Sequence, residues 1–187
     1  MLKRSMMFTL SWGALSLAPV ASVDLPAQLL PVYGGPGGTA FTRSCGTGRV
    51  LTGLRTRVGL VIDAVGVLCR PVNSNGTLGS ETTRGTHAGS GGGSIKIVRC
   101  RAGEVVSGAQ VAFGSYVDRI LMSCQPWTAA SRTVDTARFN RWIIVGNVDG
   151  GTSGTEERCE SPAQPANGIR GRATAVVDAI GFICNEP

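Results

Sequence analysis

The stretch GLRTRVGLVIDAVGVLC, residues 53–69, contains the pattern that decides the fold. Short apolar runs in it are separated by glycine, and Asp63 lies ten residues after the first glycine and six before the cysteine. The same landmarks return twice along the chain, around Asp118 and Asp178. The chain is therefore built from three copies of one unit, and such internal repeats are typical of folds whose copies pack against one another to bury a shared core.

Each unit begins upstream of its aspartate with a glycine cluster followed by a cysteine. This cysteine precedes the aspartate by 18 residues in the first two copies and by 19 in the third. The aspartates themselves are 55 and then 60 residues apart. We therefore expect a single domain over residues 34–187, made of the units 34–70, 89–127 and 150–187 with connecting strands between them.

The six cysteines allow many disulfide connectivities, and the repeat selects among them. Because equivalent units should fold equivalently, it favours the pairs Cys45–Cys69, Cys100–Cys124 and Cys159–Cys184. Metal binding is the competing use of cysteine, but the chain has no Cys-x-x-Cys spacing and its one histidine, His87, has no second histidine beside it. We predict one structural disulfide in each unit, no metal site and no cofactor.

The composition is typical of β-structure. The chain has 27 glycines and 9 prolines, and its apolar runs are rich in valine, isoleucine and threonine. No sustained apolar spacing of a helix is present. Strands are expected at 50–57, 61–69, 105–111, 116–124, 139–145, 168–173 and 176–184. Their apolar side chains should form the core, with Val65, Val67, Ile120, Met122, Ile180 and Ile183 among them.

One four-stranded sheet cannot bury its apolar face alone, so three sheets must pack around an axis. The expected fold is all-β: a threefold β-prism of three Greek-key-like four-stranded sheets with one disulfide per repeat.

The N-terminus has the features of a signal peptide. Lys3 and Arg4 precede the apolar run 6–17, and small residues follow it. We expect a signal peptide over 1–22, a linker over 23–33, and a secreted, periplasmic or extracellular protein without a membrane span in the mature chain. Removal of the two cations reduces the net charge from +6 to +4. The remaining arginines are spread along the sequence, which favours a solvated surface over a nucleic-acid site.

The glycine-rich loop that opens each unit, the Gly-x-x-x-Asp turn and the alternating apolar residues after it resemble the jacalin-related lectins. The closing segment 171–182 is especially similar to that family. The paired cysteines instead resemble vitelline membrane outer layer protein I, a secreted β-prism with disulfide-bearing repeats. The resemblance covers residues 34–187. It implies a three-sheet β-prism and a carbohydrate or glycoconjugate as the partner.

The lectin resemblance also implies site residues. In that family the Gly-x-x-x-Asp turn binds sugar through backbone N–H groups and the aspartate accepts bonds from two hydroxyls, because a carboxylate is only an acceptor. A neighbouring glycine loop, whose backbone can approach closely, completes the site. The third copy has Thr174 where the other two have glycine. The implied residues are Gly59, Leu60, Val61, Ile62 and Asp63 with Gly91, Gly92 and Gly93; Gly114, Ser115, Tyr116, Val117 and Asp118 with Gly150 and Gly151; and Asp178 with Gly34 and Gly35.

Other interpretations of the same residues stay open. An aspartate in a tight turn often bonds its own backbone, so all three could be purely structural. A structural or protein-binding secreted module is the second functional class. An enzyme is disfavoured, because Glu81, Glu104, Glu156 and Glu157 do not recur with the repeat and His87 lies in a linker rich in glycine, serine and threonine.

Overall fold

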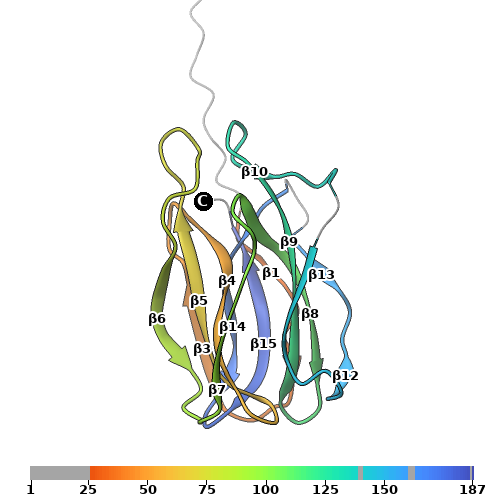
Figure 1. Ribbon diagram of the computed structural model, residues 1–187. Coiled ribbons are helices and arrows are strands. Elements are labelled where there is room, and N and C mark those ends of the chain that lie inside the picture. Colours follow the sequence, from red (N-terminus) through yellow and green to blue (C-terminus); the bar gives the residue numbers. More distant parts are fainter. Residues whose placement is uncertain (1–25, 139–140, 160–162, 186) are drawn as a thin grey trace, which may run out of the picture.

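A computed structural model describes residues 26–138, 141–159, 163–185 and 187. The described residues form an all-β molecule of three antiparallel sheets (Figure 1), which enclose a large shared core and a smaller cluster around Val50, Val105 and Val134. The predicted signal peptide, 1–22, lies outside the described residues. Within the part that is described, no helix is long and apolar enough to cross a membrane.

Each sheet has four strand positions, and two of the sheets have interrupted outer strands. Sheet A runs β1 (Gln28–Leu29) and β2 (Tyr33–Gly34), β15 (Val177–Cys184), β14 (Ala166–Ala173), β3 (Thr39–Ser44). Sheet B runs β6 (Thr82–Ala88), β5 (Ile62–Pro71), β4 (Arg49–Val58), β7 (Ser94–Arg99). Sheet C runs β10 (Thr133–Val134) and β11 (Arg141–Gly146), β9 (Val117–Thr128), β8 (Glu104–Phe113), then β12 (Thr152–Ser153) and β13 (Glu157–Arg158). The predicted β-prism of four-stranded sheets is confirmed.

The glycine ten residues before each aspartate lies at a β-bulge. The register between the two hairpin strands shifts beside Gly53, Gly108 and Gly168. Each of these glycines also pairs with a residue of the outer strand. A Cβ at any of the three would collide with the backbone of that outer strand. Glycine is therefore required for close backbone approach, which explains its recurrence in the repeat.

The outer strand after each glycine loop pairs with the hairpin of another unit. β3, from the first unit, pairs with β14 of the third, and β7, from the second, pairs with β4 of the first. In the same way, β12 and β13 pair with β8. The sequence units and the sheets therefore do not coincide: every sheet is completed by a strand from a neighbouring unit.

The three disulfides link the three sheets to one another in a closed ring. The three predicted pairs are confirmed, and each joins the end of an outer strand to the hairpin of a different sheet. Cys45–Cys69 links sheets A and B, Cys100–Cys124 links B and C, and Cys159–Cys184 links C and A.

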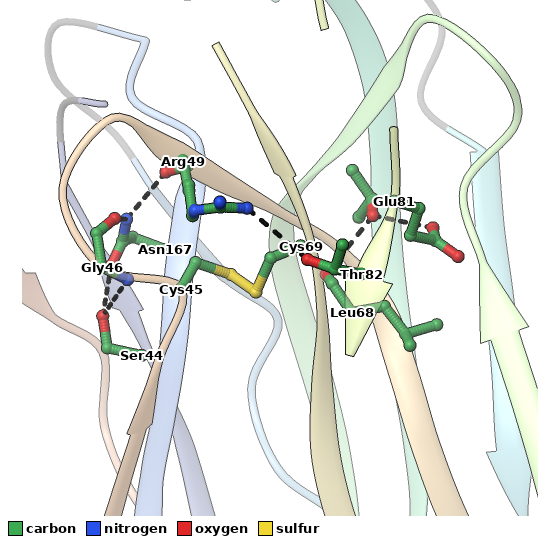
Figure 2. Close-up of a disulfide and its surroundings, with 10 residues drawn as sticks. Ser44, Cys45, Gly46, Arg49, Leu68, Cys69, Glu81, Thr82 and Asn167 are labelled. Carbon is green, nitrogen blue, oxygen red and sulfur yellow. Dashed lines mark hydrogen bonds between the residues drawn. A yellow bond between two sulfur atoms is a disulfide. The ribbon is translucent and has the colours of Figure 1, made fainter. Parts of the chain in front are cut away.

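Hydrogen bonds around the first disulfide fix the segment in which the chain passes from sheet A to sheet B (Figure 2). The Asn167 Nδ2 group donates to the carbonyls of Gly46, at 3.1 Å, and Arg49, at 2.8 Å. Its Oδ1 accepts from the Ser44 hydroxyl at 2.7 Å. Asn167 of sheet A thus fixes the connection that leads from β3 into sheet B.

The core contains five of the six predicted residues, and one prediction is wrong. Ile183 is only partly buried, whereas Phe182 is 1 % exposed and belongs to the core. Side chains alternate along β15, so the face that carries Ile180 also carries Phe182. The segment 23–33 contributes β1 within its described part, which pairs with the end of β15.

Candidate functional site

The three hairpin turns that precede the aspartates lie at one end of the prism, at the bottom of Figure 1, together with the glycine loops. Each turn is closed by one short backbone hydrogen bond. The N–H of Gly59 donates to Val61 at 3.1 Å, that of Gly114 to Tyr116 at 3.0 Å, and that of Thr174 to Val176 at 3.0 Å. The turn therefore forms equally well with threonine, so glycine is not needed to make it.

Glycine is needed in the loop that faces each aspartate. Gly38, Gly93 and Gly151 have φ values of +70°, +76° and +69°. A Cβ on any of them would collide with the carboxylate of Asp178, Asp63 or Asp118, respectively. Positive φ and the absence of a side chain together allow the loop backbone to contact the carboxylate.

A second glycine in each loop lies against the aspartate main chain. Gly34, Gly89 and Gly146 also have positive φ, and a Cβ there would collide with the carbonyl oxygen of Asp178, Asp63 or Asp118. The sequence prediction missed Gly38, Gly89 and Gly146. Alignment on the cysteines would have indicated Gly38, since it and Gly93 both precede their cysteine by seven residues.

The structure brings the predicted partners together in the predicted combinations. Asp63 lies beside Gly91 and Gly93, and Asp118 lies beside Gly150 and Gly151. The backbone carbonyl of Asp178 accepts from the Gly35 N–H at 2.8 Å. Gly92, in contrast, has no atom of another part of the chain near its Cβ position.

The three aspartates differ in exposure. Asp178 is 4 % exposed, and its buried Oδ2 has no hydrogen-bond partner among the described residues. Asp63 and Asp118 are half-buried and remain open to solvent. Gly59 contributes to this opening, because a Cβ at that position would approach the Asp63 carboxylate to 2.9 Å. The third copy carries the larger Thr174 at the equivalent position.

The turns that precede the two half-buried aspartates contain backbone donors and exposed apolar side chains. No hydrogen bond from the backbone N–H of Leu60 or Val61 to another described residue is present. Leu60 is 85 % exposed at the first turn, and Tyr116 is 45 % exposed at the second. Arg57 of β4 donates to the Gly91 carbonyl at 3.4 Å, so a guanidinium group lies at the edge of the first site.

The glutamates considered for hydrolysis have structural partners. Glu81 pairs with Arg99 at 3.3 Å and Glu104 with Arg141 at 2.8 Å, and Glu156 pairs with Arg158. Glu157 accepts from the Tyr33 hydroxyl at 2.6 Å. Among the described residues, potential metal ligands come together at Cys100, Glu104 and Cys124, where the two cysteines form a disulfide.

Concavities of the described surface include one that borders the glycine loop facing Asp118. One of about 280 Å³ lies at 131–133 and 163–165, one of about 370 Å³ lies over β3 and β14, and one of about 170 Å³ lies between β7 and β11. The smallest of these, between β7 and β11, is lined by Gly146, whose backbone lies against the Asp118 carbonyl.

Neither the protein-family models nor the curated proteins match this sequence. Solved structures do match. A variant of Malaysian banana lectin aligns with a TM-score of 0.58 at 18 % identity, over 87 % of this chain and 100 % of that chain. A mannose-binding jacalin-related lectin from Ananas comosus aligns with a TM-score of 0.58 at 19 % identity, over 86 % and 99 %.

A mannose-specific jacalin-related lectin from Morus nigra aligns with a TM-score of 0.56 at 19 % identity, over 91 % of this chain and 99 % of that chain. The resemblance inferred from the sequence is therefore confirmed for the fold: the chain has the β-prism fold of the jacalin-related lectins, with one disulfide added per unit.

Proposed function

We propose that the chain is a carbohydrate-binding, non-enzymatic protein that holds sugar at the aspartate turns of sheets B and C. The observation that carries this proposal is the pairing of a half-open carboxylate with a bare glycine backbone at Asp63 and Asp118. A carboxylate accepts hydrogen bonds from neighbouring hydroxyl donors, and the glycine loop leaves the approach free of side chains.

Each open site offers complementary groups for one sugar ring. The Asp63 carboxylate would accept from two ring hydroxyls, while the N–H groups of Leu60 and Val61 would donate to sugar oxygens. The second site repeats this with Asp118 and the N–H groups of Ser115 and Tyr116. The exposed Tyr116 ring would pack on the apolar face of the sugar, and the exposed Leu60 side chain would do so at the first site.

Two sites, not three, are proposed. Asp178 is almost fully buried, and Thr174 stands where Gly59 and Gly114 leave room. A sugar there would have to displace packed groups before it reached the carboxylate. The third copy therefore keeps the structural part of the arrangement, in which the Asp178 carbonyl holds the Gly35 N–H.

Mannose is the first ligand to examine, because two of the structural neighbours bind it. Secretion is proposed together with this function. Disulfides persist in oxidising compartments, and the three bridges join all of the sheets. Extracellular glycans are available to a protein in that location.

A glycan array that includes mannosides tests the proposal. The wild-type chain should bind a defined set of glycans, and the double variant Asp63→Asn/Asp118→Asn should lose that binding while its circular dichroism spectrum is unchanged. Asp135→Asn, the same chemical change on a residue in the connection after β10, is the matched control and should bind as the wild type does. Absence of binding to any glycan, or full binding by the double variant, would refute the proposal.

A further inference from the structure

Basic residues are concentrated on two of the three sheets. The strands of sheets A and B carry ten arginine and lysine residues and two aspartates, whereas the strands of sheet C carry three arginines and three acidic residues. The linear sequence hides this asymmetry, because sheet A is assembled from both ends of the described chain. The ten residues, called the basic face below, are Arg43, Arg49, Arg55, Arg57, Arg70, Arg84, Lys96, Arg99, Arg170 and Arg172.

Acidic side chains of the described residues neutralise little of the charge of the basic face. Among the ion pairs of the described residues, Arg99–Glu81 is the one that includes a member of the basic face. The other three belong to sheet C and its connections. Several basic-face arginines instead donate to neutral carbonyls, as Arg170 does to Leu30 at 3.1 Å and Arg172 does to Gly38 at 2.7 Å. None of the ten residues is buried.

An Arg-x-Arg pair occurs at the same place in sheets A and B. Arg55 lies opposite Gly66, and Arg170 lies opposite Gly181. The second arginine of each pair lies opposite an alanine. The space over the two glycines is occupied in different ways: the His87 ring lies over Gly66 beside Arg55, and the segment 30–32 lies over Gly181 beside Arg170. Sheet C has lost the pair, since Gln110 stands opposite Leu121 at the equivalent position.

The two sheets form one continuous surface at the contact of β3 with β6. The Arg43 Nε group donates to the Thr86 carbonyl at 2.7 Å, across the boundary between sheets A and B. Thr82, Thr83 and Thr86 of β6 are exposed beside it, and their hydroxyls can donate to anionic oxygens.

His87 of β6 lies in the positive electrostatic field of two arginines of this surface. Burial lowers the pKa of its imidazole, and the charges of Arg55 and Arg57 lower that pKa further. The ring lies 2.9 Å from an Arg55 nitrogen. At neutral pH the histidine is therefore uncharged, and the arginines supply the charge.

We propose that the basic face binds an acidic polysaccharide, a glycan chain that bears sulfate or carboxylate groups. Unpaired guanidinium groups pair well with both anions, and a continuous basic surface suits an extended chain better than a single monosaccharide. A nucleic acid fits less well, because single strands bind proteins by stacking bases on aromatic rings. Among the exposed large apolar side chains of the described residues, the aromatic one is Tyr116, in sheet C. Arg57 lies at the edge of the first aspartate turn, but binding to the basic face does not require the carboxylates of Asp63 and Asp118.

The probe is heparin, a sulfated polysaccharide, and uncharged dextran is its control. Binding of both is titrated at several salt concentrations. Wild type should bind heparin with an affinity that falls steeply with salt and should not bind dextran. Arg55→Gln/Arg170→Gln should bind about tenfold more weakly at low salt, with a shallower salt dependence. Glutamine is the matched substitution because Gln110 occupies this position in sheet C.

The control is Arg138→Gln/Arg158→Gln, which removes the same charge from sheet C and its connections and should change heparin affinity less than twofold. Equal weakening by both pairs would overturn the proposal, because binding would then depend on net charge alone. Failure of wild type to bind heparin at low salt, or tighter binding of duplex DNA than of heparin, would also overturn it. If the first pair does not fold, Arg84→Gln/Lys96→Gln, at two exposed positions, is subject to the same criteria.

Asp63→Asn/Asp118→Asn separates the two proposals. This variant should lose glycan binding at the turns and keep heparin binding. Loss of both would mean that the basic face is not an independent site, whereas loss of neither would refute the proposed turn sites alone.

Discussion

At the scale of single residues, the glycine loops and the aspartates require each other. Gly38, Gly93 and Gly151 adopt the left-handed backbone conformation, and each contacts one carboxylate. Other residues in this conformation are strained, and here they would also displace the carboxylate. These glycines are therefore required for the loop backbone to pack against the carboxylate, which is a role separate from the flexibility of the loop.

Gly93→Ala should destabilise the fold by about 1–2 kcal/mol and weaken binding at Asp63, because alanine adds backbone strain and a Cβ in contact with the carboxylate. Gly92→Ala is the matched control, since no atom of another part of the chain lies near its Cβ position and its φ is not positive. Urea unfolding of both variants measures the difference. Equal midpoints would contradict the role assigned to Gly93.

Gly59→Thr/Gly114→Thr should abolish glycan binding and leave the fold intact. Threonine already occupies the equivalent position, Thr174, and the same turn hydrogen bond forms there. The larger side chain should cover the carboxylates, as the third copy suggests. Glycan binding and thermal unfolding are the measurements, and unimpaired binding would show that the glycine does not control access.

At the scale of elements, pairing between strands was harder to predict than their positions. The cysteine, glycine and aspartate landmarks gave the hairpins β4–β5, β8–β9 and β14–β15 to within a few residues. The exchange of β3 and β7 between units was not predicted, because alternation of side chains does not specify which edge a strand joins. The interrupted strands β12 and β13 are too short for a periodic signal.

Sheet C contains an acid-sensitive ion pair, Glu104–Arg141, at the start of β8. Burial raises the pKa of Glu104, but hydrogen bonds from Arg141 and the Arg101 N–H outweigh burial and lower the pKa below its ordinary value of 4.5. A carboxylate with a lowered pKa stabilises the fold above the unfolded-state pKa, and this contribution is lost as pH falls through the folded-state value.

Wild type should therefore lose more stability than Glu104→Gln when the pH is lowered from about 5 to about 3. Urea unfolding at stepwise pH values measures the two curves. Parallel curves would contradict a stabilising role for the ionised Glu104.

At the scale of the whole molecule, the disulfides join all three sheets through a closed ring. Each bridge spans 24 or 25 residues of sequence yet connects two different sheets. The repeat predicted the cysteine pairs, but their role as links between sheets follows from the strand exchange. The basic face was hidden for the same reason, because arginines far apart in the sequence meet only after the sheets form.

Cys45→Ser/Cys69→Ser should reduce the free energy of unfolding by about 3 kcal/mol, since the bridge restricts the unfolded chain. The two other pairs close loops of nearly equal length and should have similar effects. Reduction of all three should unfold the protein at a much lower urea concentration. An unchanged midpoint under reducing conditions would contradict the stabilising role of the ring.

We propose that the threefold framework carries two sugar sites, one at Asp63 and one at Asp118. Titration calorimetry with the glycan that binds most strongly on the array measures the number of sites directly. We predict two sites in the wild type, one in Asp63→Asn, one in Asp118→Asn and two in Asp178→Asn. A stoichiometry that falls in Asp178→Asn, or that stays at two when Asp63 and Asp118 are both replaced, would contradict the account.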